Sequence, residues 1–338
     1  MKILKNELVF DQSQVPFSFC HGSSICALSD DKLIVAWFAG NSGEGGSDTS
    51  IWLAHYDDGV WGTPIEISNE STEPHWNPVL FQYHDGTIML FYKVGFEICK
   101  WHTKIKFSYD NGNTWTDSVD LVKDEKGGRG PVRNNPVELS DGSIIAGAST
   151  EGRIWSAFAD RSIDGGYTWQ KGNILTIDDL EYSGGRTIEN SNIEVSEQSF
   201  YGRGVIQPAI WESGNGHVHM LLRSTEGYIY RSDSLDFGKT WSSLYPTTLP
   251  NNNSGIDVMQ LTENKILVCY NPVGKNWGIR TPLTLITSNN NGVTWKKEMD
   301  IEVGEGEYSY PSISKYGDKI YISYTVNRIH IKVLSLKL

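Results

Sequence analysis

The sequence predicts an all-β fold, a six-bladed β-propeller formed by a single domain that spans residues 1–338. Two observations predict it. One turn motif recurs along the chain at related spacings, and the segments between its copies are short apolar runs bounded by turn residues, without helical periodicity. A unit of about four strands that repeats in this way forms a propeller, because each sheet buries its faces against its neighbours.

The recurring turn has the pattern S-x-D/N-x-G-x-T-W, called the box motif below. Its serines are 54, 72 and 54 residues apart. Asp or Asn followed by Gly between apolar runs predicts a hairpin turn, and the Trp is a large anchor for the next sheet. A reduced copy spans Tyr56–Trp61. The complete copies are Ser108–Trp115, Ser162–Trp169, Ser234–Trp241 and Ser288–Trp295.

Each repeat is expected to contain a first strand that opens with polar residues and a second strand that is strongly apolar. A segment near Ile3–Phe10 is expected to complete the last repeat, which has no box motif. The longest interval between box motifs contains extra residues in the segment Asp178–Gly204. We expect this segment to form a loop that overhangs a pocket. The second strands are Leu33–Trp37, Ile88–Lys93, Ile144–Ala148, His219–Arg223, Ile266–Asn271 and Ile320–Tyr324; the openings are His21–Ile25, Trp76–Leu80, Asn134–Val137, Gln207–Ile210, Ser254–Asp257 and Tyr308–Ile313.

Composition excludes several classes of function. The net charge of −12 argues against nucleic-acid or membrane-surface partners, which require a basic face. No apolar run reaches the roughly 20 residues of a membrane helix. The four cysteines form no CxxC pair and are expected to be buried thiols, so we expect a cytoplasmic protein, or a secreted or periplasmic one if a leader was removed. No metal-ligand spacing or phosphate-binding loop is present, so neither metal nor cofactor is expected.

The box motif resembles the Asp-box, or BNR repeat, of the sialidase (neuraminidase) superfamily, and the resemblance extends from about His21 to Arg328. Members of that superfamily bind a sugar carboxylate with three arginines. The resemblance assigns the second arginine to Arg223 and the third to Arg280. At the position of the first arginine this chain has His21, in the segment Phe19-Cys-His21.

The resemblance also assigns catalytic roles. The superfamily uses a tyrosine nucleophile, which corresponds to Tyr308 within Glu307-Tyr-Ser-Tyr310. The glutamate that activates this tyrosine is replaced by Gln207, and an amide cannot accept the proton of a phenol. The acid/base aspartate corresponds to Asp48, with Glu44 of the same loop as the alternative.

Polar residues that open or end the predicted inner strands are expected to meet in one central pocket, although they are far apart in sequence. Arginine forks match planar carboxylates, so Arg223 and Arg280 are expected to bind an anionic sugar, and Trp76 offers a face for a sugar ring. The further residues that we expect to bind substrate are Asn77, Lys93, Arg133, Glu151 and Tyr310.

Three hypotheses follow for a glycan or acidic monosaccharide substrate. The first is a sialidase-like exo-glycoside hydrolase, in which Asp48 protonates the leaving oxygen and Tyr308 attacks or stabilises the oxocarbenium-like centre. The second is a β-eliminating lyase on a uronate-containing glycan, with His21 and a tyrosine moving protons. The third is a glycan-binding propeller without catalytic activity.

Overall fold

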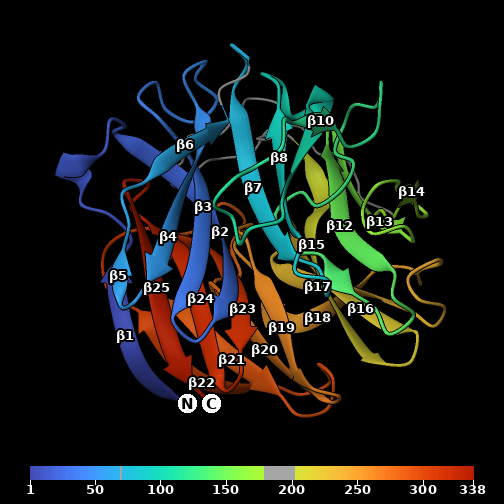
Figure 1. The fold of residues 1–338 in the computed structure, drawn as a ribbon. Helices are drawn as coiled ribbons and strands as arrows, with labels where there is room; N and C mark the ends of the chain where they lie inside the picture. Colours follow the sequence, from blue (N-terminus) through green and yellow to red (C-terminus); the bar gives the residue numbers. More distant parts are fainter. Residues whose placement is uncertain (69–70, 179–201) are drawn as a thin grey trace.

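The computed structural model describes residues 1–68, 71–178 and 202–338, and these residues form β-strands joined by turns (Figure 1). The helical segments among them are the single 3-10 turns η1 (Gln12–Gln14) and η2 (Ile98–Lys100). The all-β prediction is therefore confirmed. The stretch 178–204, expected to overhang a pocket, lies almost entirely outside the described residues.

The two ends of the chain share one sheet, with the strand order β1-β25-β24-β23. β1 pairs antiparallel with β25, and Lys2 lies opposite Lys337. The N-terminal segment thus completes the last repeat, as predicted, and both termini lie together in Figure 1. The strands are β1 (Lys2–Leu8), β23 (Tyr308–Tyr316), β24 (Lys319–Val326) and β25 (His330–Lys337).

Three further sheets follow the same antiparallel pattern in chain order. The first contains β2 (Phe19–Ser29), β3 (Lys32–Gly40), β4 (Ser50–Asp57), β5 (Val60–Trp61) and β6 (Ile65–Ser68). The second contains β7 (His75–Gln82), β8 (Ile88–Val94), β9 (His102–Ser108) and β10 (Val119–Asp120). The third contains β19 (Asp257–Thr262), β20 (Lys265–Tyr270), β21 (Leu283–Ser288) and β22 (Lys296–Glu302).

The middle of the chain forms one composite sheet. Two antiparallel groups are joined in it by a short parallel contact, in which Ile154 and Trp155 lie opposite Arg203 and Gly204. The first group contains β11 (Val137–Glu138), β12 (Ile144–Glu151), β13 (Ile154–Ser162) and β14 (Gln170–Lys171). The second contains β15 (Arg203–Gly214), β16 (His217–Ser224), β17 (Tyr228–Ser234) and β18 (Tyr245–Pro250).

The hydrophobic core lies between neighbouring sheets. β2 packs against both β7 and β23, and β15 packs against both β12 and β19, so these two strands each connect the groups of strands on either side of them. Trp37 belongs to a cluster that joins β2–β4 to β24 and β25, while Trp211 joins the β15–β16 region to β19 and β20. Truncating such a buried aromatic side chain typically costs about 3–5 kcal/mol.

The box motifs form the turns after β9, β13, β17 and β21, and their polar atoms bond within the turn. In the first copy the Asp110 carboxylate accepts hydrogen bonds from the Thr114 amide (2.8 Å) and hydroxyl (2.7 Å), and Trp115 donates to the Gly112 carbonyl (3.0 Å). Gly112 has φ of +82°, and a Cβ there would lie 2.4 Å from Ile34 Cδ1 of the preceding sheet. The motif therefore requires glycine both for its turn and for packing between sheets.

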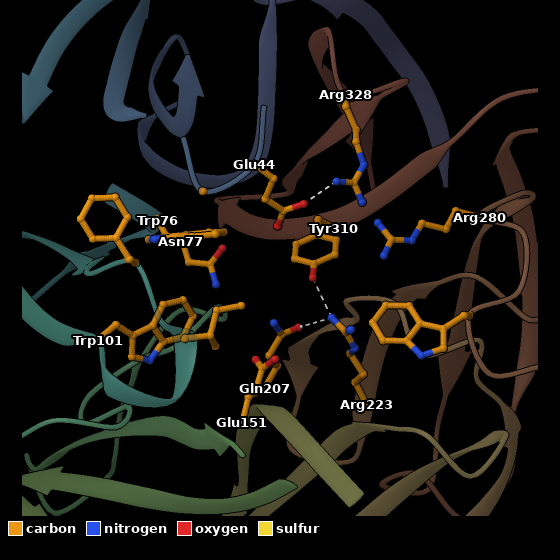
Figure 2. Close-up of a pocket in the computed structure, with 14 residues that line it drawn as sticks. Glu44, Trp76, Asn77, Trp101, Glu151, Gln207, Arg223, Arg280, Tyr310 and Arg328 are labelled. Carbon is orange, nitrogen blue, oxygen red and sulfur yellow. Dashed lines mark hydrogen bonds and ion pairs between the residues drawn. The ribbon is translucent and has the colours of Figure 1, made fainter. Parts of the chain in front are cut away.

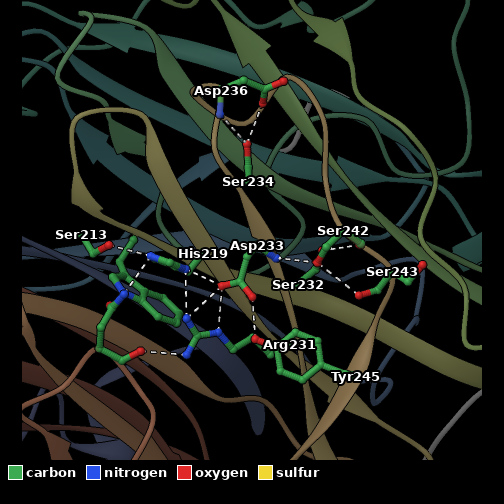
Figure 3. Close-up of polar contacts among 12 residues, drawn as sticks. Ser213, His219, Arg231, Ser232, Asp233, Ser234, Asp236, Ser242, Ser243 and Tyr245 are labelled. Atoms are coloured by element: carbon green, nitrogen blue, oxygen red, sulfur yellow. Dashed lines mark hydrogen bonds and ion pairs between the residues drawn. The ribbon is translucent and has the colours of Figure 1, made fainter.

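A second polar cluster, the His219 clamp, ties β15–β17 to the last box turn (Figure 3). Asp233 contacts His219 Nδ1 and accepts hydrogen bonds from Arg231 Nε (2.9 Å) and the Tyr245 hydroxyl (2.5 Å). Burial raises the Asp233 pKa, but the hydrogen bonds from His219, Tyr245 and Arg231 outweigh it and hold that pKa at about 2. Asn291 Nδ2 lies 2.9 Å from His219 Nε2 and so links the clamp to the box turn after β21.

Candidate functional site

A pocket of about 230 Å³ lies at the edge where first strands of the repeats begin and second strands end. Both kinds of strand terminus share this edge because neighbouring strands are antiparallel. Its wall is formed by Glu44, Gly45, Trp76, Asn77, Phe96, Ile98, Trp101, Glu151, Gln207, Arg223, Trp277, Arg280, Tyr310 and Arg328.

The pocket has a cationic side and an aromatic side. Figure 2 shows Arg223, Arg280 and Arg328 around the Tyr310 ring, with Trp76 and Trp101 across the pocket. The two tryptophan rings meet edge to face at 6.0 Å, and Trp76 Nε1 donates to the Gly95 carbonyl (2.9 Å). This division suits a ligand that carries an anionic group at one end and a ring or apolar group at the other.

Backbone irregularities in the first strands aim side chains into the pocket. β7, β15 and β23 each shift register near their beginning, and there Asn77 (φ +43°), Gln207 (φ +55°) and Tyr310 (φ +55°) adopt left-handed conformations. Each of these residues precedes a proline, which further disfavours helical backbone angles. Such strain costs about 1–3 kcal/mol per residue and is concentrated at functional sites.

Arg223, near the end of β16, connects the polar groups of the pocket floor. Its Nη1 donates to the Tyr310 hydroxyl oxygen (2.7 Å) and to Gln207 Oε1 (3.2 Å), and its Nε donates to Asn253 Oδ1 (2.7 Å). The Trp155 ring centroid lies 5.7 Å from the guanidinium carbon. Arg223 is only 3% exposed, so these contacts hold it in one orientation.

Arg280 and Arg328 are held side by side by one carboxylate. Glu307 accepts from Arg280 Nη1 (2.7 Å) and from Arg328 Nε (3.2 Å). Burial raises the Glu307 pKa, but the charges of Arg280 and Arg328 outweigh it and keep that pKa below its ordinary value. On its other side Arg328 forms an ion pair with Glu44, the residue that reaches into the pocket from the loop between β3 and β4.

His21 lies behind Tyr310 and does not line the pocket. Its ring centroid is 4.2 Å from that of Tyr310, and its Nδ1 lies 3.1 Å from Thr325 Oγ1. Burial, followed by the charges of Arg328 and Arg280, lowers the His21 pKa well below its ordinary value. The side chain is therefore neutral at physiological pH, and its buried position separates it from a substrate.

Comparisons with known proteins place the chain in a family. The family model for the BNR repeat-like domain matches residues 31–322. The chain belongs to the BNR repeat-like family. No curated protein matches this BNR-repeat chain in sequence.

Solved structures share its fold at low sequence identity. A Dyadobacter fermentans protein of unknown function is 15% identical, with a TM-score of 0.76 over 100% of this chain and 99% of that one. A Hadza microbial sialidase, Hz136, is 16% identical with a TM-score of 0.77, over 98% and 68% of the two chains. The Trypanosoma rangeli sialidase is 16% identical with a TM-score of 0.69, over 95% and 55%. The expected likeness to sialidases is confirmed for the fold.

Of the residues expected to form the pocket of this BNR-repeat protein, most are brought together. Among the expected catalytic residues only Gln207 lines it. Three expected catalytic residues and two expected binding residues lie elsewhere or behind it, as described for His21 above and for the others below. The expected binding residues on the wall are Trp76, Asn77, Glu151, Arg223, Arg280 and Tyr310.

Tyr308 does not line the pocket. Its hydroxyl donates to the Glu305 carbonyl (3.2 Å), and its amide bonds to the Arg280 carbonyl (2.9 Å). Tyr310 occupies the pocket instead, because the register shift between Ser309 and Ser312 turns its side chain inward. Alternation along a regular strand puts both tyrosines on one face, so the sequence pattern alone does not distinguish them.

Asp48 is likewise replaced on the pocket wall by a neighbour in its loop. Its carboxylate accepts hydrogen bonds from the backbone amides of Asn41 (2.7 Å) and Ser42 (3.2 Å). Burial raises the Asp48 pKa, but these hydrogen bonds together outweigh it, so the pKa lies below its ordinary value. Asp48 therefore shapes the loop, and Glu44 is the loop carboxylate that reaches the pocket.

Lys93 and Arg133 are buried below the pocket instead of lining it. Lys93 donates to Thr103 Oγ1 (2.6 Å) and to the Arg129 carbonyl (2.5 Å), and burial lowers its pKa to about 7. Arg133 Nη2 donates to the carbonyls of Tyr310 (2.5 Å) and Pro311 (2.9 Å). Both are thus placed to support the pocket from inside the fold.

Several residues of the wall are not among those predicted from the sequence. Arg328 follows the predicted second strand Ile320–Tyr324, and its place after a strand end is the signal that could have identified it. Phe96, Ile98 and Trp101 come from the irregular segment after β8, where no periodicity places side chains.

The described residues offer neither a cluster of metal-ligating side chains nor a membrane-spanning helix. They contain no group of three or more His, Cys, Asp or Glu side chains arranged to hold a metal ion. Within the same residues no helix is long and apolar enough to cross a membrane.

Proposed function

We propose that this chain is a single-domain, six-bladed β-propeller, with the composite sheet counted as two blades, and that it is an exo-acting glycoside hydrolase for a carboxylate-bearing sugar. The observation that carries the proposal is the meeting of Arg223, Arg280 and Arg328 around the Tyr310 phenol in one pocket. The likeness of the fold to sialidases agrees with it.

The arginines supply recognition. Guanidinium groups bind carboxylates through charge-assisted, often bidentate, hydrogen bonds, so a sugar carboxylate is held against the cationic side. His21 stands where the superfamily has its first arginine. Arg328, from a different repeat, supplies the positive charge that this position lacks. The sugar ring then faces Tyr310, and the leaving group extends toward Trp76 and Trp101.

Tyr310 and Glu44 supply the chemistry. Tyr310 attacks the anomeric carbon or stabilises its positive charge, and Glu44 donates a proton to the leaving oxygen. The substrate carboxylate competes with Glu44 for Arg328, so binding releases Glu44 from its ion pair and frees it to act as the acid.

The test is product analysis by mass spectrometry on a panel of sialosides, uronosides and neutral glycosides. Hydrolysis adds one water to the substrate mass, whereas elimination adds none and gives an ultraviolet-absorbing product. Release of a free acidic sugar from one acidic glycoside, with neutral glycosides untouched, is the expected result. Products with the mass of elimination, or turnover of neutral glycosides only, would contradict the proposal.

Glycan binding without turnover is the second candidate. Gln207 favours it, because an amide at this position cannot act as the base that the sialidase resemblance requires. Measurable affinity for an acidic sugar combined with an unchanged substrate mass across the panel would select this candidate.

A further inference from the structure

The Tyr310 phenol lies within a cluster of buried guanidinium groups. The ring centroid is 5.3 Å from the guanidinium carbon of Arg133, 5.4 Å from that of Arg280 and 5.8 Å from that of Arg223. We call these three arginines the guanidinium cluster. One of them also touches the reactive atom, because Arg223 Nη1 donates to the Tyr310 oxygen at 2.7 Å.

Burial strengthens the effect of this cluster. Arg133 is fully buried and Arg223 and Arg280 are each 3% exposed, so water screens their charges poorly. The carbonyl groups of Tyr310 and Pro311, which accept from Arg133 Nη2, carry no charge, and Nε and Nη1 of Arg133 have no hydrogen-bond partner among the described residues. The charge of Arg133 therefore acts on the neighbouring Tyr310 ring as well as on Asp257.

Gln207 preserves the charge of the cluster. Its Oε1 accepts from the same Arg223 Nη1 that contacts the phenol, at 3.2 Å. An amide accepts this bond without cancelling the charge of Arg223. A glutamate in its place would form an ion pair with Arg223 and add a negative charge beside the phenol.

We propose that the guanidinium cluster, in which the neutral amide of Gln207 bonds to Arg223 without cancelling its charge, replaces a carboxylate base by stabilising negative charge on the Tyr310 oxygen. This inference rests on the proposed function in that Tyr310 is the reacting group. Gln207, at the position of the superfamily's glutamate, then changes only how the tyrosine is activated. Tyr310 itself remains the catalytic group.

The reaction step balances without a protein base. The Tyr310 oxygen loses its proton to a water molecule in the pocket and forms a bond to the anomeric carbon. The bond from that carbon to the leaving oxygen breaks, and the leaving oxygen takes a proton from Glu44. Water then attacks the anomeric carbon and gives one proton to the Glu44 carboxylate. The bond to the tyrosine oxygen breaks, and this oxygen leaves as the negative group that the cluster stabilises and then takes back a proton from solvent.

Other charged or titratable groups also lie near Tyr310, and they differ in how they affect the charge on its oxygen. His21, whose ring is tilted against that of Tyr310, is neutral. The carboxylates nearest the cationic side are already bound by Arg280 and Arg328, while Asp257 lies beyond Arg133, with its pKa raised to about 7 by burial. Among the described residues, the charged or titratable groups around the phenol are Arg133, Arg223, Arg280, Arg328, His21, Glu44, Glu151, Glu307 and Asp257.

A titration that needs no substrate tests the inference. The pH-dependent tyrosinate absorbance of the wild type minus that of Tyr310→Phe isolates this one phenol. The same difference is measured in the Gln207→Glu background and, as a control for added charge, in Gln170→Glu, which is exposed on β14. The midpoint is expected to move up by at least about one pH unit in Gln207→Glu and to stay in place in the control.

Two variants at Arg133 distinguish the effect of its charge from the effect of its packing. Arg133→Lys keeps the charge and loses the planar fork, whereas Arg133→Gln keeps polarity and loses the charge. The midpoint is expected to rise in Arg133→Gln and to stay near the wild-type value in Arg133→Lys. If both variants shift equally, Arg133 acts only through packing and its part in the cluster is wrong.

Turnover gives a second, independent readout. We expect Gln207→Glu to lower kcat about tenfold, because it neutralises Arg223. A higher kcat, or a lower or unchanged titration midpoint, would overturn the inference and restore the glutamate as the better activating group. Absence of turnover in the wild type would instead contradict the proposed hydrolase, while the titration still decides the role of the cluster.

Discussion

The two ends of the sheets are built on different principles. At the box turns, polar atoms bond within a few residues of their own position, as Asp110 does with Thr114, and the arrangement repeats almost unchanged. At the pocket, side chains bond to partners far away in sequence: Arg223 meets Tyr310, 87 residues away, and Arg328 meets Glu44, 284 residues away. Each repeat contributes a different residue to the pocket.

The contrast between the box turns and the pocket shows that the residues specific to one chemistry lie in the pocket. The repeated turns stabilise each sheet by the same local contacts, so they identify an architecture and leave the chemistry open. The pocket combines unlike residues on strained backbone, such as Gln207 and Tyr310, and this strain is tolerated because the surrounding sheets hold it. Changes at the pocket should therefore affect activity, and changes at the turns should affect stability.

Two tyrosines of β23 should give the largest difference in activity. Tyr310→Phe removes the reacting oxygen and is expected to lower kcat about a thousandfold or more, with the thermal unfolding temperature little changed. Tyr308→Phe, two residues away and outside the pocket, is the matched control and should keep kcat within about twofold. Equal losses in both variants would contradict the assignment of Tyr310.

The loop between β3 and β4 allows a second pairwise test. Glu44→Gln removes the proton donor and is expected to lower kcat roughly a hundredfold, whereas Asp48→Asn should have the smaller effect, because it only weakens hydrogen bonds to Asn41 and Ser42. The comparison uses steady-state kinetics with a substrate that has a good leaving group, which should largely restore the Glu44 variant. A larger loss in Asp48→Asn would return the acid role to Asp48.

At the opposite end of the sheets, a box glycine should affect stability alone. Gly238 has φ of +72°, and a Cβ would lie 2.1 Å from Ile145 Cδ1. Gly238→Ala is expected to lower the free energy of unfolding by about 2–3 kcal/mol, measured by denaturant titration, with kcat unchanged. Gly142→Ala is the control, because its φ is also positive (+79°) and nothing lies within 4 Å of the added Cβ. A loss of kcat without a loss of stability would contradict the division between the two ends.

The His219 clamp should give the smallest effect, with a defined pH dependence. Asp233→Asn weakens the contacts to His219, Arg231 and Tyr245 and is expected to cost about 1–2 kcal/mol at neutral pH. Since the Asp233 pKa in the folded protein, about 2, lies below its ordinary value, the ionised group stabilises the fold above about pH 4. The stability difference between wild type and variant should shrink as pH falls from about 4 toward 2; a constant difference would show that the charge is not involved.

The repeats explain why the fold was easier to predict than the site. Turn residues and apolar alternation act locally, so box motifs and strand runs in the sequence indicated the β architecture, including the N-terminal strand that pairs with β25. The register shift at Tyr310 and the conformation of the loop that holds Glu44 depend on tertiary contacts, which a linear pattern does not contain. The prediction therefore chose Tyr308 and Asp48, each within a few residues of the side chain that reaches the pocket.

The preference of the pocket for a carboxylate over a neutral group is the direct test of its arginine side. Calorimetric titration would compare an acidic monosaccharide with its carboxyl-reduced alcohol, using wild type and Arg280→Ala. We expect the acid to bind the wild type at least about a hundredfold more tightly than the alcohol, and Arg280→Ala to remove most of this preference. Equal affinities of the wild type for acid and alcohol would contradict this expectation.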